Sequence, residues 1–120
     1  MTLRRMKTYT AQSGYVYQYY FVGKRAALPG DPERPATEFV FDVSPDRKNM
    51  FSVSVFLGEG AVSAWISAHG RPLNGAEQYA AAKLRLFRGF DEVENMLGQG
   101  RRLRVDAAEL EELLAGLGVE

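Results

Sequence analysis

The chain has no cysteine, one histidine and one tryptophan among its 120 residues. Without thiols it has no disulfide, no cysteine-bound zinc or iron–sulfur cluster and no thiol nucleophile. A single histidine without cysteines also offers too few ligands for an ordinary transition-metal site. No catalytic motif and no glycine-rich phosphate loop stands out. We therefore expect no metal, no cofactor and no catalytic residues, in a protein that is not an enzyme.

An excess of charge of either sign is missing too. Fifteen Lys and Arg side chains balance fifteen Asp and Glu side chains, so no overall field attracts nucleic acid or anionic lipid. Residues 1–60 carry eight basic and six acidic side chains, and residues 61–120 carry seven and nine, which gives +2 and −2. This asymmetry is too small to identify a partner.

Long hydrophobic runs are absent as well. The basic start Met1–Lys7 is followed by polar residues where a signal peptide needs an apolar stretch, and no segment reaches transmembrane length. We expect a soluble, cytoplasmic protein that does not enter a membrane. Its length is sufficient for one domain over residues 1–120 with a hydrophobic core of its own.

Residues 74–97 show the clearest helical period in the sequence. Asn74 and Glu77 have the spacing of an N-cap and its reciprocal capping glutamate. Gly89 interrupts the pattern, so we predict a kink, which we favour, or a break into two helices near residues 88–90. The apolar side chains recur at three- and four-residue steps: Tyr79, Ala82, Leu86, Phe90, Val93 and Leu97.

A C-terminal helix is predicted over residues 106–116. Asp106 is its expected N-cap, with Glu109 at the capping-box position. Its acidic side chains are expected to face solvent, opposite a stripe of four leucines: Leu110, Leu113, Leu114 and Leu117. Before this helix, residues 101–105 predict a short edge strand whose charges discourage further pairing.

Residues 7–22 are rich in the aromatic and β-branched residues typical of strands. We predict one long strand, or two short strands that meet at Ser13–Gly14. Strict alternation gives two bulky faces, one with Tyr15, Tyr17, Tyr19 and Phe21 and one with Val16, Gln18, Tyr20 and Val22. Residues 23–36 hold three of the five prolines and predict a loop.

Residues 37–44 and 50–57 alternate apolar and polar residues around a Pro-Asp turn and predict a β-hairpin. Its inward side chains are Phe39, Phe41, Val43, Phe51, Val53, Val55 and Leu57. After a tight connection at residues 58–60, we predict a third strand over residues 61–69. That strand would place Ser63, Trp65, Ser67 and His69 on one polar sheet face with Ser52 and Ser54.

Strands first and helices last predict the α+β class. We expect an antiparallel meander of about four to five strands with two C-terminal helices packed on one face. The elements do not alternate as they do in parallel sheets, so a nucleotide-binding crevice of the doubly wound kind is not expected.

One candidate site is the aromatic row Tyr15, Tyr17 and Tyr19, followed by Lys24 and Arg25. Exposed rings stack on bases and cations follow the backbone, so these residues suit single-stranded nucleic acid. The alternative is that the rings are strand formers, buried against a helix or a partner subunit. The neutral chain lacks the basic footprint of nucleic-acid binders, which favours this alternative.

A second candidate is a small anion or ligand site that combines His69 and Arg71 with the free amides of the helix beginning at Asn74. Trp65 is expected beside it. The alternative is that Asn74 and Glu77 already satisfy those amides and that Arg71 is solvated. Catalysis by His69, oriented by Asp42 or Glu38, has little support without a nucleophile motif.

The preferred function is a small binding module that self-associates as a homodimer. Two helices can cover only one face of the sheet, and the other face, with Trp65, Met50 and Phe56, would expose more apolar area than a monomer usually tolerates. A symmetric dimer through the sheet face or edge would cover this area. Nucleic-acid binding and a small-ligand site are the alternatives.

Overall fold

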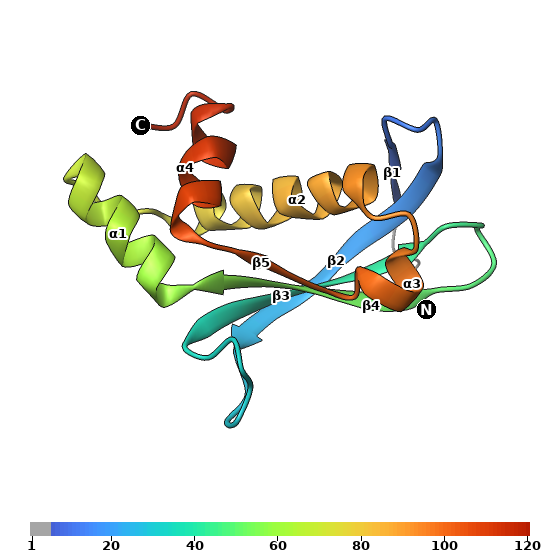
Figure 1. Ribbon diagram of the computed structural model, residues 1–120, viewed down its shortest axis with the longest axis horizontal. Helices are drawn as coiled ribbons and strands as arrows, with labels where there is room; N and C mark the ends of the chain where they lie inside the picture. The colour runs from blue at the N-terminus through green and yellow to red at the C-terminus, as the bar shows by residue number, and fades with distance from the viewer. Residues whose placement is uncertain (1–5) are drawn as a thin grey trace.

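The computed structural model describes residues 6–120, which form a five-stranded sheet with its helices on one side (Figure 1). The strands lie in the order of the sequence. They are β1 (Lys7–Thr10), β2 (Val16–Ala26), β3 (Ala36–Ser44), β4 (Phe51–Gly58) and β5 (Arg102–Val105). The helices are α1 (Glu59–His69), α2 (Gly75–Glu92), α3 (Met96–Gln99) and α4 (Ala107–Ala115). Residues 1–5, which belong to the predicted domain and to the basic start of the sequence, lie outside the described residues.

The α+β class is confirmed, but the sheet is mixed. Strands β1 to β4 form the predicted antiparallel meander, whereas β5 pairs with β4 in parallel, from Ser54 opposite Arg102 to Leu57 opposite Val105. A purely antiparallel sheet was therefore a wrong prediction. Parallel neighbours cannot be joined by a hairpin and need a crossover. Here the chain crosses over through α1, α2 and α3 before it returns as β5.

Residues 59–69 form helix α1, so the predicted strand over residues 61–69 is wrong. Its many small residues fit either period, and alanine is the best helix former. Read with a helical period, Ala61 and Trp65 share one face, and both are buried. The helix ends at Gly70, whose φ of 70° is the left-handed conformation that glycine adopts without strain. Trp65 therefore packs in the helical layer and lies on no sheet face.

The long helix predicted over residues 74–97 is two helices. The capping box of Asn74 and Glu77 is present, as predicted, but α2 ends at Glu92 and α3 follows after three residues. The break lies four residues beyond Gly89, which stays inside α2 and is buried. The predicted break near residues 88–90 therefore lies a few residues later, and α2 is continuous through Gly89, which packs closely against β5.

Helix α4 begins after the predicted N-cap Asp106, whose side chain accepts a hydrogen bond from the Glu109 amide. It packs chiefly against α1 and α2, so the prediction of two helices lying on the sheet was partly wrong. Figure 1 shows α4 standing beside α1 at the far end of α2 from α3. None of the described helices is long and apolar enough to cross a membrane. A cytoplasmic location stays a prediction.

Residues 7–26 form two antiparallel strands, the second of the two predicted alternatives. They turn at Gly14, whose φ is 89°. Strand β2 continues to Ala26, so the loop predicted over residues 23–36 is shorter and spans residues 27–35. The extension includes a β-bulge between Phe21 and Gly23, where Val22 is the extra residue. The prolines of this segment begin at Pro29, so they exclude strand pairing only from that residue onward.

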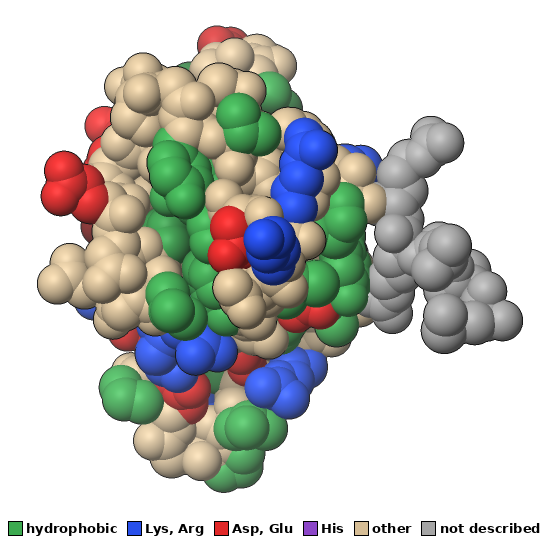
Figure 2. All heavy atoms as spheres, turned by 90° about the vertical axis from the view of Figure 1, so that its right-hand side faces the viewer, with side chains coloured by type: hydrophobic (Ala, Val, Ile, Leu, Met, Phe, Trp, Pro, Cys, Tyr) green, Lys and Arg blue, Asp and Glu red, His purple; other side chains and the backbone are tan. Residues whose placement is uncertain are grey.

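The core lies between the sheet and the helices. The predicted hairpin of β3 and β4 is confirmed, with Phe39, Phe41, Val53 and Val55 fully enclosed. Ring packing extends the core to β2: Tyr17 stacks on Phe90 of α2 with ring centres 4.2 Å apart. Figure 2 views the end of the sheet beside α3, and hydrophobic side chains there lie on both sides of a central group of charged ones.

Candidate functional site

The face of the sheet opposite the helices is covered by no described helix (Figure 1). Alternation along β2 turns Val16 and Val22 toward this face, and they are 40 % and 42 % exposed. Tyr20 and Val40 lie on the same face and are half-buried. We call the surface formed by these four residues and their polar neighbours on β2 to β4 the open face.

The open face carries a buried carboxylate, Glu38 of β3, which is only 6 % exposed. It accepts hydrogen bonds from Arg25 of β2 at 3.0 and 3.4 Å and from the Ser54 hydroxyl of β4 at 2.6 Å. Burial alone would raise the pKa of Glu38, but these hydrogen bonds and the Arg25 charge outweigh it and lower that pKa. The same pairing raises the pKa of Arg25. Glu38 is therefore held ionised and fully bonded.

A second carboxylate, Asp42, follows Glu38 on the same face of β3. It accepts a hydrogen bond from the Tyr20 hydroxyl at 2.7 Å and from the Ser52 hydroxyl at 3.3 Å. Both acidic side chains of the open face are thus paired by neighbouring strands. Covering paired groups costs less than covering isolated charges, because their partners move out of water with them.

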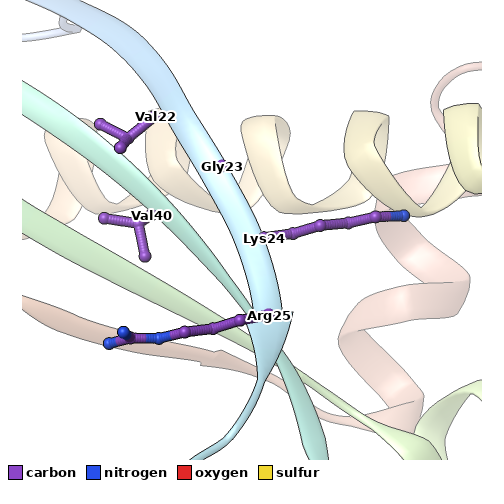
Figure 3. Close-up of a pocket in the computed structure, with 5 residues that line it drawn as sticks. All are labelled: Val22, Gly23, Lys24, Arg25 and Val40. Atoms are coloured by element: carbon purple, nitrogen blue, oxygen red, sulfur yellow. The ribbon is translucent and has the colours of Figure 1, made fainter.

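The β-bulge hollows the open face. Gly23 has no side chain there, and the depression of about 270 Å³ is lined by Val22, Gly23, Lys24, Arg25 and Val40. Figure 3 shows Val22, Val40 and Arg25 on one side of β2, with Lys24 pointing to the other side. The bulge therefore separates the two predicted cations, because Lys24 faces the helices while Arg25 joins the open face.

The loop over residues 27–35 covers the other end of this sheet surface. Phe56 is buried with Ala27 and Ala36 in a small separate cluster. The Arg102 guanidinium lies 4.4 Å from the Phe56 ring centre and 2.8 Å from Asp31 of the loop. The hydrophobic exposure that the sequence predicts for Phe56 is therefore wrong, and the open face is confined to the β2 side.

The predicted nucleic-acid residues do not form an exposed row. Tyr15 is 51 % exposed, but Tyr17 and Tyr19 are buried against α2. Burial raises the pKa of both buried hydroxyls. The structural premise of three exposed rings is therefore wrong, and the alternative that the rings serve the core holds for two of them. Binding of nucleic acid itself stays a prediction.

The structure brings three of the four predicted ligand residues together in the helical layer. The Trp65 ring is 1 % exposed and stacks on His69 with ring centres 4.1 Å apart. The Arg71 guanidinium lies 4.8 Å from the Trp65 ring centre. The tryptophan is thus enclosed by a histidine and an arginine, and its predicted place on a polar sheet face is wrong.

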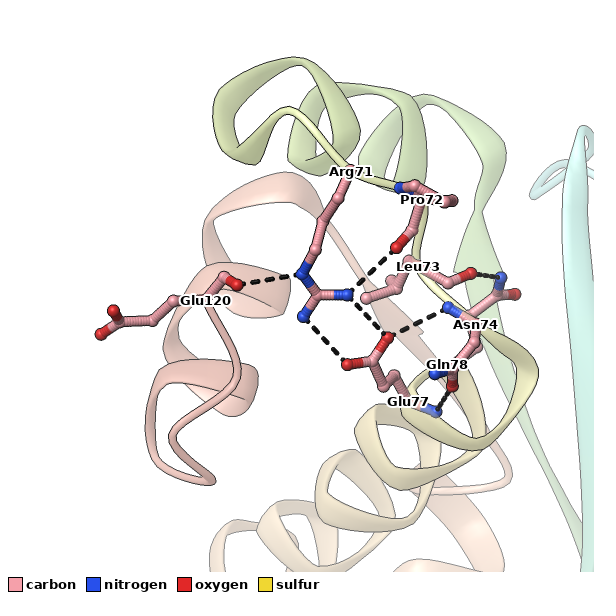
Figure 4. Close-up of polar contacts among 7 residues, drawn as sticks. All are labelled: Arg71, Pro72, Leu73, Asn74, Glu77, Gln78 and Glu120. Carbon is pink, nitrogen blue, oxygen red and sulfur yellow. Dashed lines mark hydrogen bonds and ion pairs between the residues drawn. The ribbon is translucent and has the colours of Figure 1, made fainter.

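The fourth residue, Asn74, belongs to the capping box and is engaged with Glu77 (Figure 4). Arg71 donates two hydrogen bonds, of 3.1 and 3.0 Å, to the carboxylate of the same glutamate. It also donates to the carbonyl oxygens of Pro72 and Glu120. The Arg71 fork, and then the Asn74 amide, lower the pKa of Glu77. The alternative that Glu77 satisfies the helix amides is confirmed, and Arg71 is ion-paired where the sequence predicted solvation. An anion would have to displace Glu77.

His69 meets neither Asp42 nor Glu38, the two orienting groups that the sequence offered. Its Nε2 lies 2.8 Å from a carboxylate oxygen of Glu111 on α4. Two other glutamates of α4 reach α2, since Glu109 pairs with Arg85 and Glu112 with Arg88. The acidic side chains of α4 therefore form ion pairs with α1 and α2, while those of Glu111 and Glu112 remain 46 % and 66 % exposed, as the predicted solvated face requires. Only the arrangement of the helices, which the sequence did not give, brings these charges together.

The residues that sequence reasoning missed are the polar partners on the open face. Arg25 and Tyr20 were each assigned to another role or to none, although the hairpin register and the alternation of β2 bring them beside Glu38 and Asp42. The open face with its paired carboxylates is the best candidate site that this geometry offers. Compared with protein-family models, curated proteins and solved structures, the chain shows no match.

Proposed function

We propose that the protein is a binding module that associates with a second copy of itself through the open face. The supporting observation is an aliphatic centre, made by Val16, Val22 and Val40, on a sheet surface whose acidic groups are already paired. Interfaces combine such an apolar centre with a satisfied polar rim. A sheet face that stays in water gains no stability from pairing an apolar centre with a satisfied polar rim.

Charge favours a second copy as the occupant. The Arg25 side chain is 56 % exposed, whereas the side chain of its partner Glu38 is only 7 % exposed, so each copy offers the guanidinium at its surface with the carboxylate beneath it. In a two-fold symmetric dimer, a residue i that contacts j is matched by j contacting i. Arg25 of one copy can in this way approach Asp42 of the other, which is half-buried and less enclosed than Glu38. The zero net charge of the chain adds no repulsion between copies.

The shape of the open face sets the geometry of the dimer. The bulge depression beside Gly23 is lined by Val22, Val40, Lys24 and Arg25, and we expect it to receive a side chain from the facing copy. Val22 lies at the edge of this depression. We expect the Val22 side chain of one copy to fill the depression of the other. A stable dimer needs about 800 Å² buried on each copy. The aliphatic centre alone is too small, so the Arg25–Glu38 and Tyr20–Asp42 pairs must lie inside the contact.

The test is the mass of the particle in solution, measured by light scattering and sedimentation over a micromolar concentration series. We expect a dimer for the unchanged chain and a monomer for Val22→Glu, because the new carboxylate would lose its water where valine buries only apolar surface. Ile66→Glu is the matched control, since Ile66 is exposed on α1, away from the sheet face. It should remain a dimer.

Two results would contradict the proposal. One is a strict monomer of the unchanged chain throughout the concentration series. The other is a dimer that survives Val22→Glu but is lost in Ile66→Glu, which would place the contact on the helical side. Both variants must keep the native emission of the buried Trp65, so that loss of the dimer is not loss of the fold.

A further inference from the structure

A hollow opens into the core at the end of the sheet beside α3. It has a volume of about 270 Å³ and lies between the sheet and the α2–α3 connection. Tyr17, Phe51 and the adjoining Tyr15 of the β1–β2 turn line it from the sheet side, and Glu94, Met96 and Leu97 line it from the helical side. Figure 2 views this end of the molecule. The hollow is separate from the open face, which lies on the other side of the sheet.

The floor of the hollow is apolar and its walls are exposed. Tyr17 and Met96 are buried, whereas Tyr15 and Leu97 are 51 % and 57 % exposed. Tyr15 and Leu97 are two of the eight large hydrophobic residues that are exposed in the part of the chain that the structure describes. Small-molecule sites have this construction, with apolar walls and few polar groups.

Aromatic rings supply most of the sheet-side wall. The Tyr15 and Tyr17 ring centres lie 5.1 Å apart and the rings are tilted by 45°. The Phe51 ring already has a cationic neighbour, because the Arg101 guanidinium lies 5.9 Å from its ring centre. The same guanidinium donates a hydrogen bond to the Ser52 carbonyl oxygen. Ring faces carry negative partial charge, so they attract cations and do not attract anions.

The only charged side chain that lines the hollow is acidic. Glu94 is exposed, and among the described residues it has no hydrogen-bond or ion-pair partner. The neighbouring Asn95 uses its side-chain oxygen to cap α3 through the Gly98 amide. An unpaired carboxylate beside exposed rings gives the hollow a negative character, although Arg101 lies nearby and offsets part of it.

We propose that this hollow binds an organic cation, an ammonium group that carries alkyl substituents. Methyl or methylene groups fill the space against Met96 and Leu97, the rings attract the distributed positive charge, and Glu94 is its counter-ion. A metal cation is disfavoured because Mg²⁺ and Ca²⁺ require several oxygen ligands. An anion would meet an unpaired carboxylate, and a neutral apolar ligand would gain nothing from it.

The test compares two probes of the same shape. Choline and its neutral isostere 3,3-dimethylbutan-1-ol are titrated into the protein while the methyl signals of Met96 and Leu97 are followed by NMR. We expect choline to bind with millimolar affinity and about tenfold more tightly than the isostere, the preference that cation–π contacts of this kind supply. Equal binding of the two probes, or shifts confined to other residues, would overturn the proposal.

Variants assign the preference to individual groups. Tyr15→Leu keeps apolar bulk but removes a ring, so the preference for choline should fall about threefold, while Tyr15→Phe retains it. Glu94→Gln should weaken choline binding without changing the isostere. Glu59→Gln is the matched control, since Glu59 is an exposed carboxylate at the start of α1, at the other end of the molecule (Figure 1).

The outcomes separate this proposal from self-association. Val22→Glu lies outside the hollow and should leave choline binding unchanged whether or not the copies associate. If Tyr15→Leu and Glu94→Gln bind choline as tightly as the unchanged chain, the hollow is not the site and the proposal is wrong. If Tyr15→Phe loses binding as fully as Tyr15→Leu, the hydroxyl matters and the cation–ring account is wrong.

Discussion

Gly89 of α2 lies so close to Leu103 of β5 that a Cβ atom at position 89 would be 2.8 Å from the Leu103 Cδ1 atom. The two residues belong to different layers, and both are buried. A glycine at this point lets the crossover helix approach the parallel edge strand. The glycine that interrupts the helical period in the sequence therefore marks a contact between layers, and the helix is continuous through it.

We predict that Gly89→Ala destabilises the protein by about 1 kcal/mol. Alanine gains about 1 kcal/mol of helix propensity over glycine, but overpacking a core costs about 1–3 kcal/mol, so the clash with Leu103 decides the sign. Urea unfolding measures the change. Gly75→Ala, in the first turn of the same helix, is the control, because its Cβ would meet only Lys24 Nζ at an ordinary 3.8 Å. Greater stability of Gly89→Ala would contradict the close contact.

The β1–β2 hairpin is fastened to α2 by a hydrogen bond from the Tyr9 hydroxyl to Asp91, with an oxygen–oxygen distance of 2.8 Å. Tyr9→Phe keeps the ring stacked on Phe87 and removes only this bond. We expect a loss of about 1 kcal/mol in the free energy of unfolding. Tyr15→Phe removes a hydroxyl from an exposed ring and should change stability by less than about 0.5 kcal/mol. Equal values for the two variants would show that the Tyr9–Asp91 bond contributes nothing.

Local signals in the sequence predicted a large part of the fold. Alternation placed Phe39, Phe41 and Val43 inward, because burial of one sheet face imposes a period of two. Cap residues placed the starts of two helices at Asn74 and Asp106, because their side chains satisfy free amides of the first turn. Such features depend on neighbours a few residues away.

Features that depend on distant contacts escaped the sequence. Residues 61–69 are small enough to fit a strand or a helix, and the choice follows from the crossover that parallel pairing of β5 requires. The candidate site shows the same limit. Tyr20 and Arg25 are ordinary strand residues in sequence, and only the register beside β3 gives them Asp42 and Glu38 as partners.

Trp65 offers a direct test of the corrected helix. We predict that Trp65→Ala lowers the free energy of unfolding by about 3–5 kcal/mol, the cost of emptying a large aromatic site in a core. A tryptophan on an exposed sheet face would instead cost within about 0.5 kcal/mol. His69→Ala is the comparison, since it removes the stacked neighbour and leaves the tryptophan in place. Its effect should be clearly smaller than that of Trp65→Ala.

Glu38 makes stability depend on pH at the acidic end. Its pKa in the folded chain is lowered, because the hydrogen bonds and charge that outweigh its burial favour the ionised form. A lowered folded pKa means that the contribution is fully present above the ordinary glutamate pKa of about 4.3 and is lost as pH falls through the folded value. Unfolding free energy measured from neutral to acidic pH should therefore fall less steeply below about pH 4.3 in Glu38→Gln than in the unchanged chain.

Arg25→Gln tests the cause of the lowered pKa of Glu38. It removes the guanidinium but keeps Ser54, so burial should then count for more and the Glu38 pKa should rise. Because the unfolded pKa sets the upper end of the pH range over which the contribution is lost, a higher folded pKa narrows that range. The acid-dependent loss of stability should therefore be smaller than in the unchanged chain, in the same direction as for Glu38→Gln. Carbon NMR of the Glu38 carboxyl reports the same shift directly. If the Glu38 carboxyl titrates alike with and without Arg25, the ion pair does not keep it ionised. The argument that paired carboxylates lower the cost of covering the open face would then fail.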